Sequence, residues 1–212
     1  MEYIDVYDEA LNFIVTMPSD EAHKLGAWHK VMHFWIVREE GKSQYLIFQK
    51  RSDSKVNFPG LFDITSAGHY QTGESIDNTR EVQEELGLSV IHDKKIHLGL
   101  RIDIFKEEKT ANREFCETFL YHDNKPLMSY DIDCDEVVGL IQIEINDGLK
   151  LFSNVVDNII VSGFEFDPIK KEKIERDYIL NRESFVKRLD PYYGKMFMIS
   201  KAYFDGNTEL FI

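Results

Sequence analysis

The chain has 212 residues, of which 43% are hydrophobic, so it can bury one core and we expect a single domain with additions at its ends. Its net charge of −13 argues against nucleic acid as a partner, because nucleic-acid binding depends on clustered Lys and Arg. The acidic N-terminus, the two cysteines and the lack of an apolar run of about 18 residues argue against a signal peptide, a disulfide framework and a membrane span. We therefore expect a cytoplasmic protein that acts on a small molecule.

Strands are predicted where β-branched and aromatic residues cluster between turn residues. In chain order the predicted strands are 3–8, 30–37, 44–50, 89–105, 113–122 and 136–145. An acidic loop around Gly41 joins the second and third of them as a hairpin.

Helices are predicted at 77–87, 167–189 and 190–206. The last two begin with Asp-Pro, which suits an N-cap followed by Pro at the first helical position, and the first ends at Gly87. The order of elements predicts a mixed β-sheet with helices packed on it.

The predicted helix at 77–87 carries an acidic edge. At about 100° per residue, Glu81, Glu84 and Glu85 share one side of the helix, whereas Val82 and Leu86 point elsewhere. Like charges at this spacing destabilise a helix by roughly 0.2–0.5 kcal/mol per pair, and a divalent cation would remove that repulsion. Mg²⁺ and Mn²⁺ bind carboxylates together with substrate phosphates. The alternative is an exposed acidic helix face without a metal, and the surrounding spacing decides between the two.

The acidic edge belongs to a longer pattern. Gly68, five residues and Glu74 are followed by REVQEELGL at 80–88. This order resembles the signature of the Nudix hydrolase family. One departure is that five residues, SIDNT, lie between Glu74 and Arg80, where the family has seven. Because removing two residues inside a helix would turn its ends by about 200° relative to each other, we expect the shortening before the helix, with Asp77 or Asn78 as its cap.

The resemblance implies a fold and a reaction. The fold is an α/β/α sandwich with a mixed β-sheet, forming a single domain over 1–212 with a core at about 28–150, an N-terminal strand segment and additional C-terminal helices. The reaction is hydrolysis of a diphosphate bond in a small molecule, usually a nucleoside diphosphate linked to another group. The implied cofactor is Mg²⁺ or Mn²⁺, and a homodimer is usual in the family.

The resemblance also assigns roles to residues. The implied metal ligands are Glu81, Glu84 and Glu85, with the carbonyl of Gly68 nearby. The implied catalytic residues are Glu84 and Glu85, with Arg80 and Glu74 holding the acidic side chains in place. Family members place the proton acceptor on the signature helix or on a later loop, so the candidates for it are Glu85, Glu114 and Glu136.

Segments outside the signature resemble the Nudix branch related to type 1 isopentenyl-diphosphate isomerase. They are DVYDE (5–9), AHKLGAWHKVMHFWIV (22–37), LIFQKRS (46–52), FPGLFDITSAGH (58–69) and DEVVGL (135–140). This resemblance implies a second metal site at His29, His69 and Glu136, because imidazole suits transition metals better than Mg²⁺. The isomerase's catalytic Cys position holds Ala67 here, and a methyl group cannot transfer a proton. We expect a hydrolase; the alternatives are a metal-dependent isomerase and a catalytically silent ligand-binding domain.

Lys50 and Arg51 stand at the end of a predicted strand, where the family uses cations to meet phosphate. The two side chains point to opposite faces of a regular strand, so we expect only Arg51 to reach the site.

The remaining aromatic and histidine side chains receive ordinary structural roles. The rings predicted to be core residues rather than base-stacking groups are Trp28, Phe58 and Phe62. The histidines predicted to be surface residues are His23, His92, His97 and His122.

Overall fold

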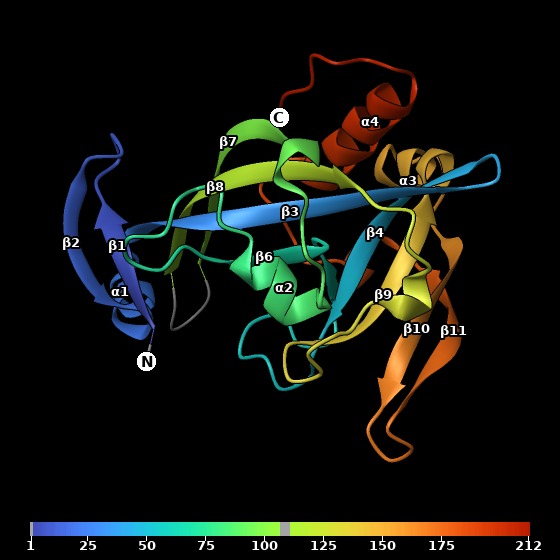
Figure 1. The fold of residues 1–212 in the computed structure, drawn as a ribbon, viewed down its shortest axis with the longest axis horizontal. Helices are drawn as coiled ribbons and strands as arrows, with labels where there is room; N and C mark the ends of the chain where they lie inside the picture. The colour runs from blue at the N-terminus through green and yellow to red at the C-terminus, as the bar shows by residue number, and fades with distance from the viewer. Residues whose placement is uncertain (1, 107–110) are drawn as a thin grey trace.

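The computed structural model describes residues 2–106 and 111–212, which fold around one mixed sheet (Figure 1). Its strands are β1 (Tyr3–Tyr7), β2 (Phe13–Pro18), β3 (Trp28–Glu40), β4 (Ser43–Arg51), β5 (Phe62–Asp63), β6 (Ser66–His69), β7 (Lys95–Lys106), β8 (Ala111–His122), β9 (Val137–Glu144), β10 (Ile159–Asp167) and β11 (Glu172–Leu180). Its α-helices are α1 (Ser19–Leu25), α2 (Arg80–Leu86), α3 (Ile145–Phe152) and α4 (Tyr192–Phe204). Within the described ranges, no helix is both long and apolar enough to cross a membrane.

The strand order is β11-β10-β9-β4-β3-β1-β2, and β3 pairs with more strands than any other strand of the described sheet does. It pairs in parallel with β8 over Trp28 to Val37, and antiparallel with β1, β4 and β6 along different parts of its length. The strand β7 pairs with β8, and β5 pairs with β4. Residues from β6 and β8 are therefore brought beside the first half of β3.

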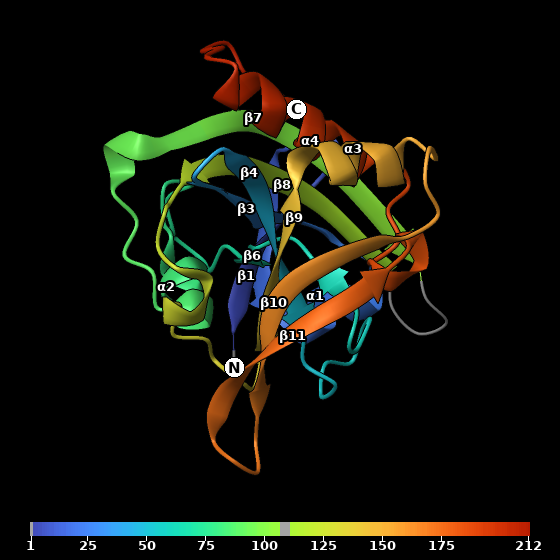
Figure 2. The ribbon, with the colours of Figure 1, turned by 90° about the vertical axis from the view of Figure 1, so that its right-hand side faces the viewer.

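The long strand β3 also gives the sheet its two covered faces, because successive residues of a strand point to opposite sides. Phe34 packs in one hydrophobic cluster with Val82 and Leu86 of α2, whereas Trp35 packs in the other cluster with Phe197 of α4. Figures 1 and 2 show α2 on one side of the sheet and α3 and α4 on the other. The predicted α/β/α sandwich is confirmed.

Each predicted strand overlaps an observed one, and β3 and β4 pair across a turn in which Gly41 has φ 63°. The predicted strand at 89–105 starts late, since β7 begins at Lys95 after a 3₁₀ turn at His92–Lys94. The helix predicted at 190–206 is α4. The strands and α-helices that were not predicted are β2, α1, β5, β6, α3, β10 and β11.

The helix predicted at 167–189 is wrong. The chain there completes a hairpin in which β10 pairs with β11 from Ile159↔Leu180 to Asp167↔Glu172. The Asp167 carboxylate accepts hydrogen bonds from the amides of Ile169 and Lys170 at 2.9 and 3.1 Å. Asp-Pro favours the first turn of a helix and also the first two positions of a β-turn, and the long-range pairing with β9 decides for the turn.

A buried ion network ties the C-terminal segment to the sheet. The Arg188 guanidinium donates to Asp63 of β5 and, at 2.6 Å, to Asp103 of β7. Arg101 joins the same network, at 3.0 Å from Asp103 and 2.9 Å from Asp190. Burial alone would raise the pKa of Asp63, but the charges of Arg188 and Arg51 and the hydrogen bond from Arg188 together outweigh it and hold that pKa below its usual range. The network therefore keeps charged groups in the interior by pairing them.

Arg188→Met is expected to lower the free energy of unfolding by about 3–5 kcal/mol, because removing one partner leaves buried carboxylates without a counter-charge. Urea unfolding followed by circular dichroism measures the change. The neighbouring Lys187 side chain is 76% exposed, so Lys187→Met serves as the matched control and should change stability by no more than about 0.5 kcal/mol. Equal stability of the two variants would contradict the role given to Arg188.

Candidate active site

A cavity of about 530 Å³ lies where β3, β6, α2 and the loop after β4 meet. Its wall includes Gly68 from β6 and Arg80, Glu81, Glu84 and Glu85 from α2. The helix α2 buries its apolar side against the sheet and turns its acidic edge to the cavity. The signature residues that the sequence singles out thus converge on one hollow.

Gly68 leaves room for the side chain of Glu81. A Cβ placed on Gly68 would lie 2.2 Å from the Cδ atom of Glu81, a distance that real side chains do not show. Glu85 lies deeper, only 4% exposed, and its carboxylate accepts a hydrogen bond from the Ala67 amide at 3.3 Å. Burial raises the pKa of Glu85 to about 8 and also raises the pKa of Glu81. These shifts are typical of acidic groups held together away from water.

Arg80 links the acidic side chains to one another. Its guanidinium lies 2.8 Å from Glu74, 2.7 Å from Glu81 and 2.7 Å from Glu84, and it donates to the His69 carbonyl at 3.2 Å. These contacts raise the pKa of Arg80 against the opposing effect of burial, so the side chain stays charged. One cation therefore orders three carboxylates against β6.

The short segment between Glu74 and Arg80 precedes the helix, as predicted from the spacing. The first residue of α2 is Arg80, and the Asn78 side chain accepts a hydrogen bond from its amide at 2.9 Å, although the N-cap residue itself is Thr79. Glu74 reaches Arg80 in spite of the shortening. Its other oxygen accepts from the Gln71 amide at 2.8 Å, which fixes the carboxylate from the opposite side.

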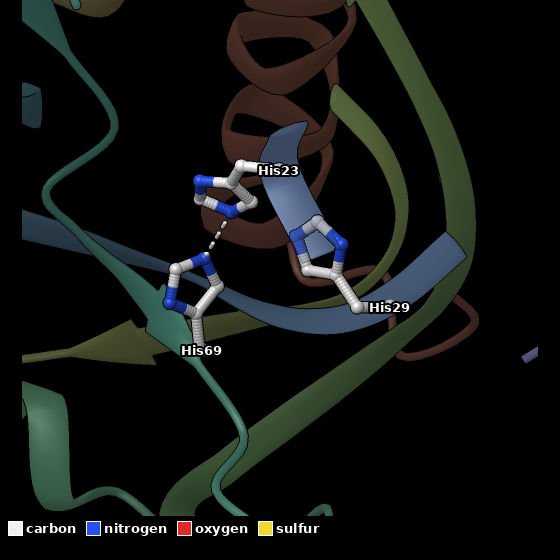
Figure 3. Close-up of side chains that lie close together, drawn as sticks. All are labelled: His23, His29 and His69. Atoms are coloured by element: carbon white, nitrogen blue, oxygen red, sulfur yellow. Dashed lines mark hydrogen bonds between the residues drawn. The ribbon is translucent and has the colours of Figure 1, made fainter. Parts of the chain in front are cut away.

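Three histidines, from α1, β3 and β6, cluster together (Figure 3). Two of them, His23 and His69, line the same cavity, and His29 is buried beside them. The Nε2 atoms of His23 and His69 are 3.1 Å apart, and the ring of His29 lies 5.0 Å from that of His23 and 5.2 Å from that of His69. Burial and the neighbouring His69 lower the pKa of His23 to about 4 and that of His29 to about 3, so both rings are neutral near pH 7. The Glu2 carboxylate accepts a hydrogen bond from Nδ1 of His69 at 3.0 Å. Nitrogen atoms of the three rings lie within 4.8 Å of one another.

This cluster corrects two predictions. His23 was expected at the surface but belongs to the group with His29 and His69. Glu136, expected to complete that group, instead contacts Lys55 elsewhere on the cavity wall. The short helix α1 places His23 beside His29 of β3. No periodic pattern in the sequence predicts this helix.

Lys50 and Arg51 point in different directions, as their places on β4 require. Lys50 lies 2.9 Å from Glu165 and faces the Tyr178 ring rather than the cavity, so its position does not support the predicted phosphate contact. Arg51 lines the cavity, but its guanidinium donates to the carbonyls of Asn57 at 2.9 Å and Phe58 at 3.2 Å. Arg51 thus shapes the loop after β4.

The other two candidates for the proton acceptor, Glu114 and Glu136, also line the cavity. Glu114 of β8 is buried, and burial raises its pKa to about 7. Its Oε1 atom accepts from the Asn112 amide at 2.7 Å and lies 4.0 Å from Nε2 of His29. The side chain of Glu136 is 43% exposed and is held by Lys55. Water can therefore reach the Glu136 carboxylate more easily than that of Glu114.

The chain was compared with known families and proteins. No family model matches it. A protein of Clostridium acetobutylicum named as an uncharacterized Nudix hydrolase is 37% identical over 193 residues, which cover 91% of this chain and 93% of the relative. The chain belongs to the Nudix hydrolase family.

Two further comparisons agree with this assignment. Nudix hydrolase 3 of Arabidopsis thaliana is 37% identical over 92% of this chain, but the match spans only 22% of that longer protein. The crystal structure of DR0079 from Deinococcus radiodurans has a TM-score of 0.53 and 20% identity, covering 72% of this chain and 90% of that one. The similarity to DR0079 supports only the fold of this Nudix hydrolase.

Sequence reasoning missed several residues at this Nudix site. Lys55 and Arg188 both line the cavity, and Glu2 reaches it from the N-terminal segment. The position of Lys55 in the sequence, between the strand at 44–50 and the Gly68 segment, is a weak indication that it lies near the site. Arg188 and Glu2 come from opposite ends of the chain and have no such signal, since only the folded sheet brings them to the cavity.

Proposed function

We propose that this Nudix hydrolase cleaves a diphosphate bond in a small molecule, a nucleoside diphosphate linked to another group, inside the cavity beside α2. The observation that carries the proposal is the convergence of Glu81, Glu84 and Glu85 on one cavity with Gly68 pressed against Glu81. Such a group of carboxylates would hold Mg²⁺ or Mn²⁺, both of which prefer oxygen ligands.

The residues present fit such a cation. The three carboxylates and the nearby Gly68 carbonyl all offer oxygen ligands. Burial raises the pKa values of Glu81 and Glu85, and a bound cation would favour their charged forms. Arg80 positions Glu81 and Glu84, and Glu74 in turn positions Arg80. A bound divalent cation would neutralise diphosphate oxygens and lower the pKa of a bound water.

We assign the proton acceptor to Glu136. Glu85 is buried within the acidic cluster and accepts a hydrogen bond from the Ala67 amide. Glu114 is also buried, and it accepts a hydrogen bond from the Asn112 side chain. Glu136 faces the cavity with 43% of its side chain exposed, so it can meet a water molecule there. Lys55 holds its carboxylate in place.

We further propose a second metal site made by His23, His29 and His69. Neutral imidazole nitrogens are good ligands for transition metals. The Nε2 atom of His29 is buried and has no hydrogen-bond partner among the residues that the structure describes, as expected for an atom that awaits a ligand. The Glu2 carboxylate contacts Nδ1 of His69, and a carboxylate at this ring nitrogen commonly orients a histidine whose other nitrogen binds a metal.

The isomerase alternative lacks a proton-transfer group in the required place. Ala67 lines the cavity at the position where the resemblance puts the catalytic Cys. Cys116 is fully buried on β8, and burial raises the pKa of its thiol, so it is a poor proton donor and acceptor near neutral pH. The intact acidic cluster favours a catalytic over a silent domain.

The first test is an activity panel with Mg²⁺ and a set of nucleotide sugars, dinucleotides, nucleoside triphosphates and isopentenyl diphosphate. Glu84→Gln should lower kcat/KM by at least about 100-fold and raise the Mg²⁺ concentration needed, because it removes a ligand. Glu136→Gln should lower kcat by about 10²–10⁴-fold at an unchanged Mg²⁺ requirement, because it removes a proton acceptor.

The matched control in this panel is Glu175→Gln, an exposed residue on β11 that should leave activity unchanged. Undiminished phosphate release by Glu84→Gln would contradict the assignment of Glu84 as a metal ligand. Formation of an allylic isomer without hydrolysis would support the isomerase instead, and binding without turnover would support a silent domain.

Gly68→Ala is expected to weaken Mn²⁺ binding about tenfold or more, because the new Cβ would occupy the space of the Glu81 side chain. Electron paramagnetic resonance of free Mn²⁺ measures the affinity without any substrate. Gly194→Ala is the control, since its Cβ would meet Phe152 at an ordinary 3.5 Å. Equal Mn²⁺ affinity in both variants would remove Gly68 from the site.

The histidine site predicts a visible Co²⁺ absorption spectrum from bound imidazole nitrogens. His29→Gln should abolish that spectrum, and His92→Gln, at a position 63% exposed and outside the cavity wall described here, should not. Retention of the full spectrum by His29→Gln and His23→Gln alike would show that Co²⁺ binds elsewhere.

A further inference from the structure

Two aromatic rings meet at the cavity wall outside the hydrophobic cores. Phe58, in the loop after β4, and Phe105, near the end of β7, both line the cavity with their ring centroids 5.4 Å apart and their planes at 61°. Both side chains are partly exposed, and neither belongs to the hydrophobic clusters found among the described residues. By contrast, Phe62 and Trp28 are buried, as predicted for core residues. The expectation that Phe58 is a core residue is therefore wrong.

The backbone of Phe58 is held in an uncommon conformation. Its φ of 52° lies in the left-handed region, which bulky side chains rarely adopt. Arg51 accounts for how this conformation persists, since it donates to the carbonyls of both Asn57 and Phe58. A strained residue that the surroundings fix in place, with its ring toward a cavity, is a reason to look for a ligand.

Asn112 lies beside this aromatic pair. It is the direct cross-strand partner of Phe105 in the antiparallel β7–β8 ladder, so the two side chains emerge on the same face of the sheet. Its amide nitrogen donates to Glu114 at 2.7 Å, which fixes the orientation of the amide. Its Oδ1 atom is buried and has no hydrogen-bond partner within the described part of the chain, although Asn112 is in the cavity wall. A buried acceptor without a donor is unfavourable unless a ligand supplies one.

We propose that Phe58, Phe105 and Asn112 form the subsite for a planar heterocycle bearing an N–H donor, a nucleobase attached to the diphosphate. The ring would stack on the partly exposed aromatic faces, and its amino group would donate to Oδ1 of Asn112. An aliphatic prenyl chain would leave that oxygen unpaired, and a bare sugar would leave the two rings uncovered. The inference rests on the proposed function, because it places the organic half of the same substrate.

The test measures binding without turnover. Isothermal titration calorimetry compares AMP, CMP and GMP with ribose 5-phosphate, which carries the phosphate and sugar but no base, in Mg²⁺ and separately in chelator. At least one of the three nucleotides should bind about tenfold or more tightly than ribose 5-phosphate. Phe58→Leu should reduce that ratio about fivefold to a hundredfold, the effect of losing one stacked ring, while the affinity for ribose 5-phosphate stays constant.

Two substitutions refine the test and one controls it. Phe58→Tyr keeps an aromatic face and should retain the preference. Asn112→Leu should reduce it, because the amino group of the bound base loses its acceptor. Phe211→Leu removes a ring that is 78% exposed and outside the cavity wall, and should change nothing. Equal binding of ribose 5-phosphate and all three nucleotides would overturn the inference, as would an undiminished preference in Phe58→Leu. Hydrolysis is not needed for either result, so failure of the catalytic assignment is observed separately in the Glu84→Gln panel.

Discussion

Several carboxylates share a small, partly buried volume only where positive charge lies among them, and in this cavity Arg80 supplies that charge. Its guanidinium holds Glu74, Glu81 and Glu84 at hydrogen-bond distance and also donates to the His69 carbonyl of β6. The acidic edge of α2 is thereby fixed relative to the sheet before any ligand arrives. The positions proposed for the metal ligands depend on this one side chain.

The other cations of the cavity wall are already engaged. In the described part of the chain, Arg51 contacts Asp63, Lys55 contacts Glu136, and Arg188 contacts Asp63. These pairs build the wall rather than offer unbalanced positive charge to a substrate. A diphosphate entering the cavity would therefore need added positive charge, which agrees with a divalent cation bound beside α2. The same pairs link β4, β5 and the C-terminal segment, so fold and site share their contacts.

The sequence predicted the parts of this site that are local. The signature from Gly68 to Leu88 is one continuous stretch, and a strand, a loop and a helix suffice to bring its residues together. The hairpin of β10 and β11 was misread because Asp167-Pro168 fits two local structures and only pairing with β9 selects one. His23 was missed because its place depends on α1 folding back over β3. The free oxygen of Asn112 depends on strand register, which no local pattern reveals.

Glu74 has a consequence for how relatives of this protein can be recognised. Its two oxygens bind the Gln71 amide and the Arg80 guanidinium, each at 2.8 Å, so the carboxylate is anchored at both ends of the intervening loop. Residues 75–79 connect these two anchors and make contacts of their own, since the Asn78 side chain accepts from the Arg80 amide and the Ile76 carbonyl accepts from the Tyr70 hydroxyl. The count of residues between Glu74 and Arg80 is thus a property of the loop. The contact between the two side chains is the property of the site, and in this chain it forms across a segment of five residues.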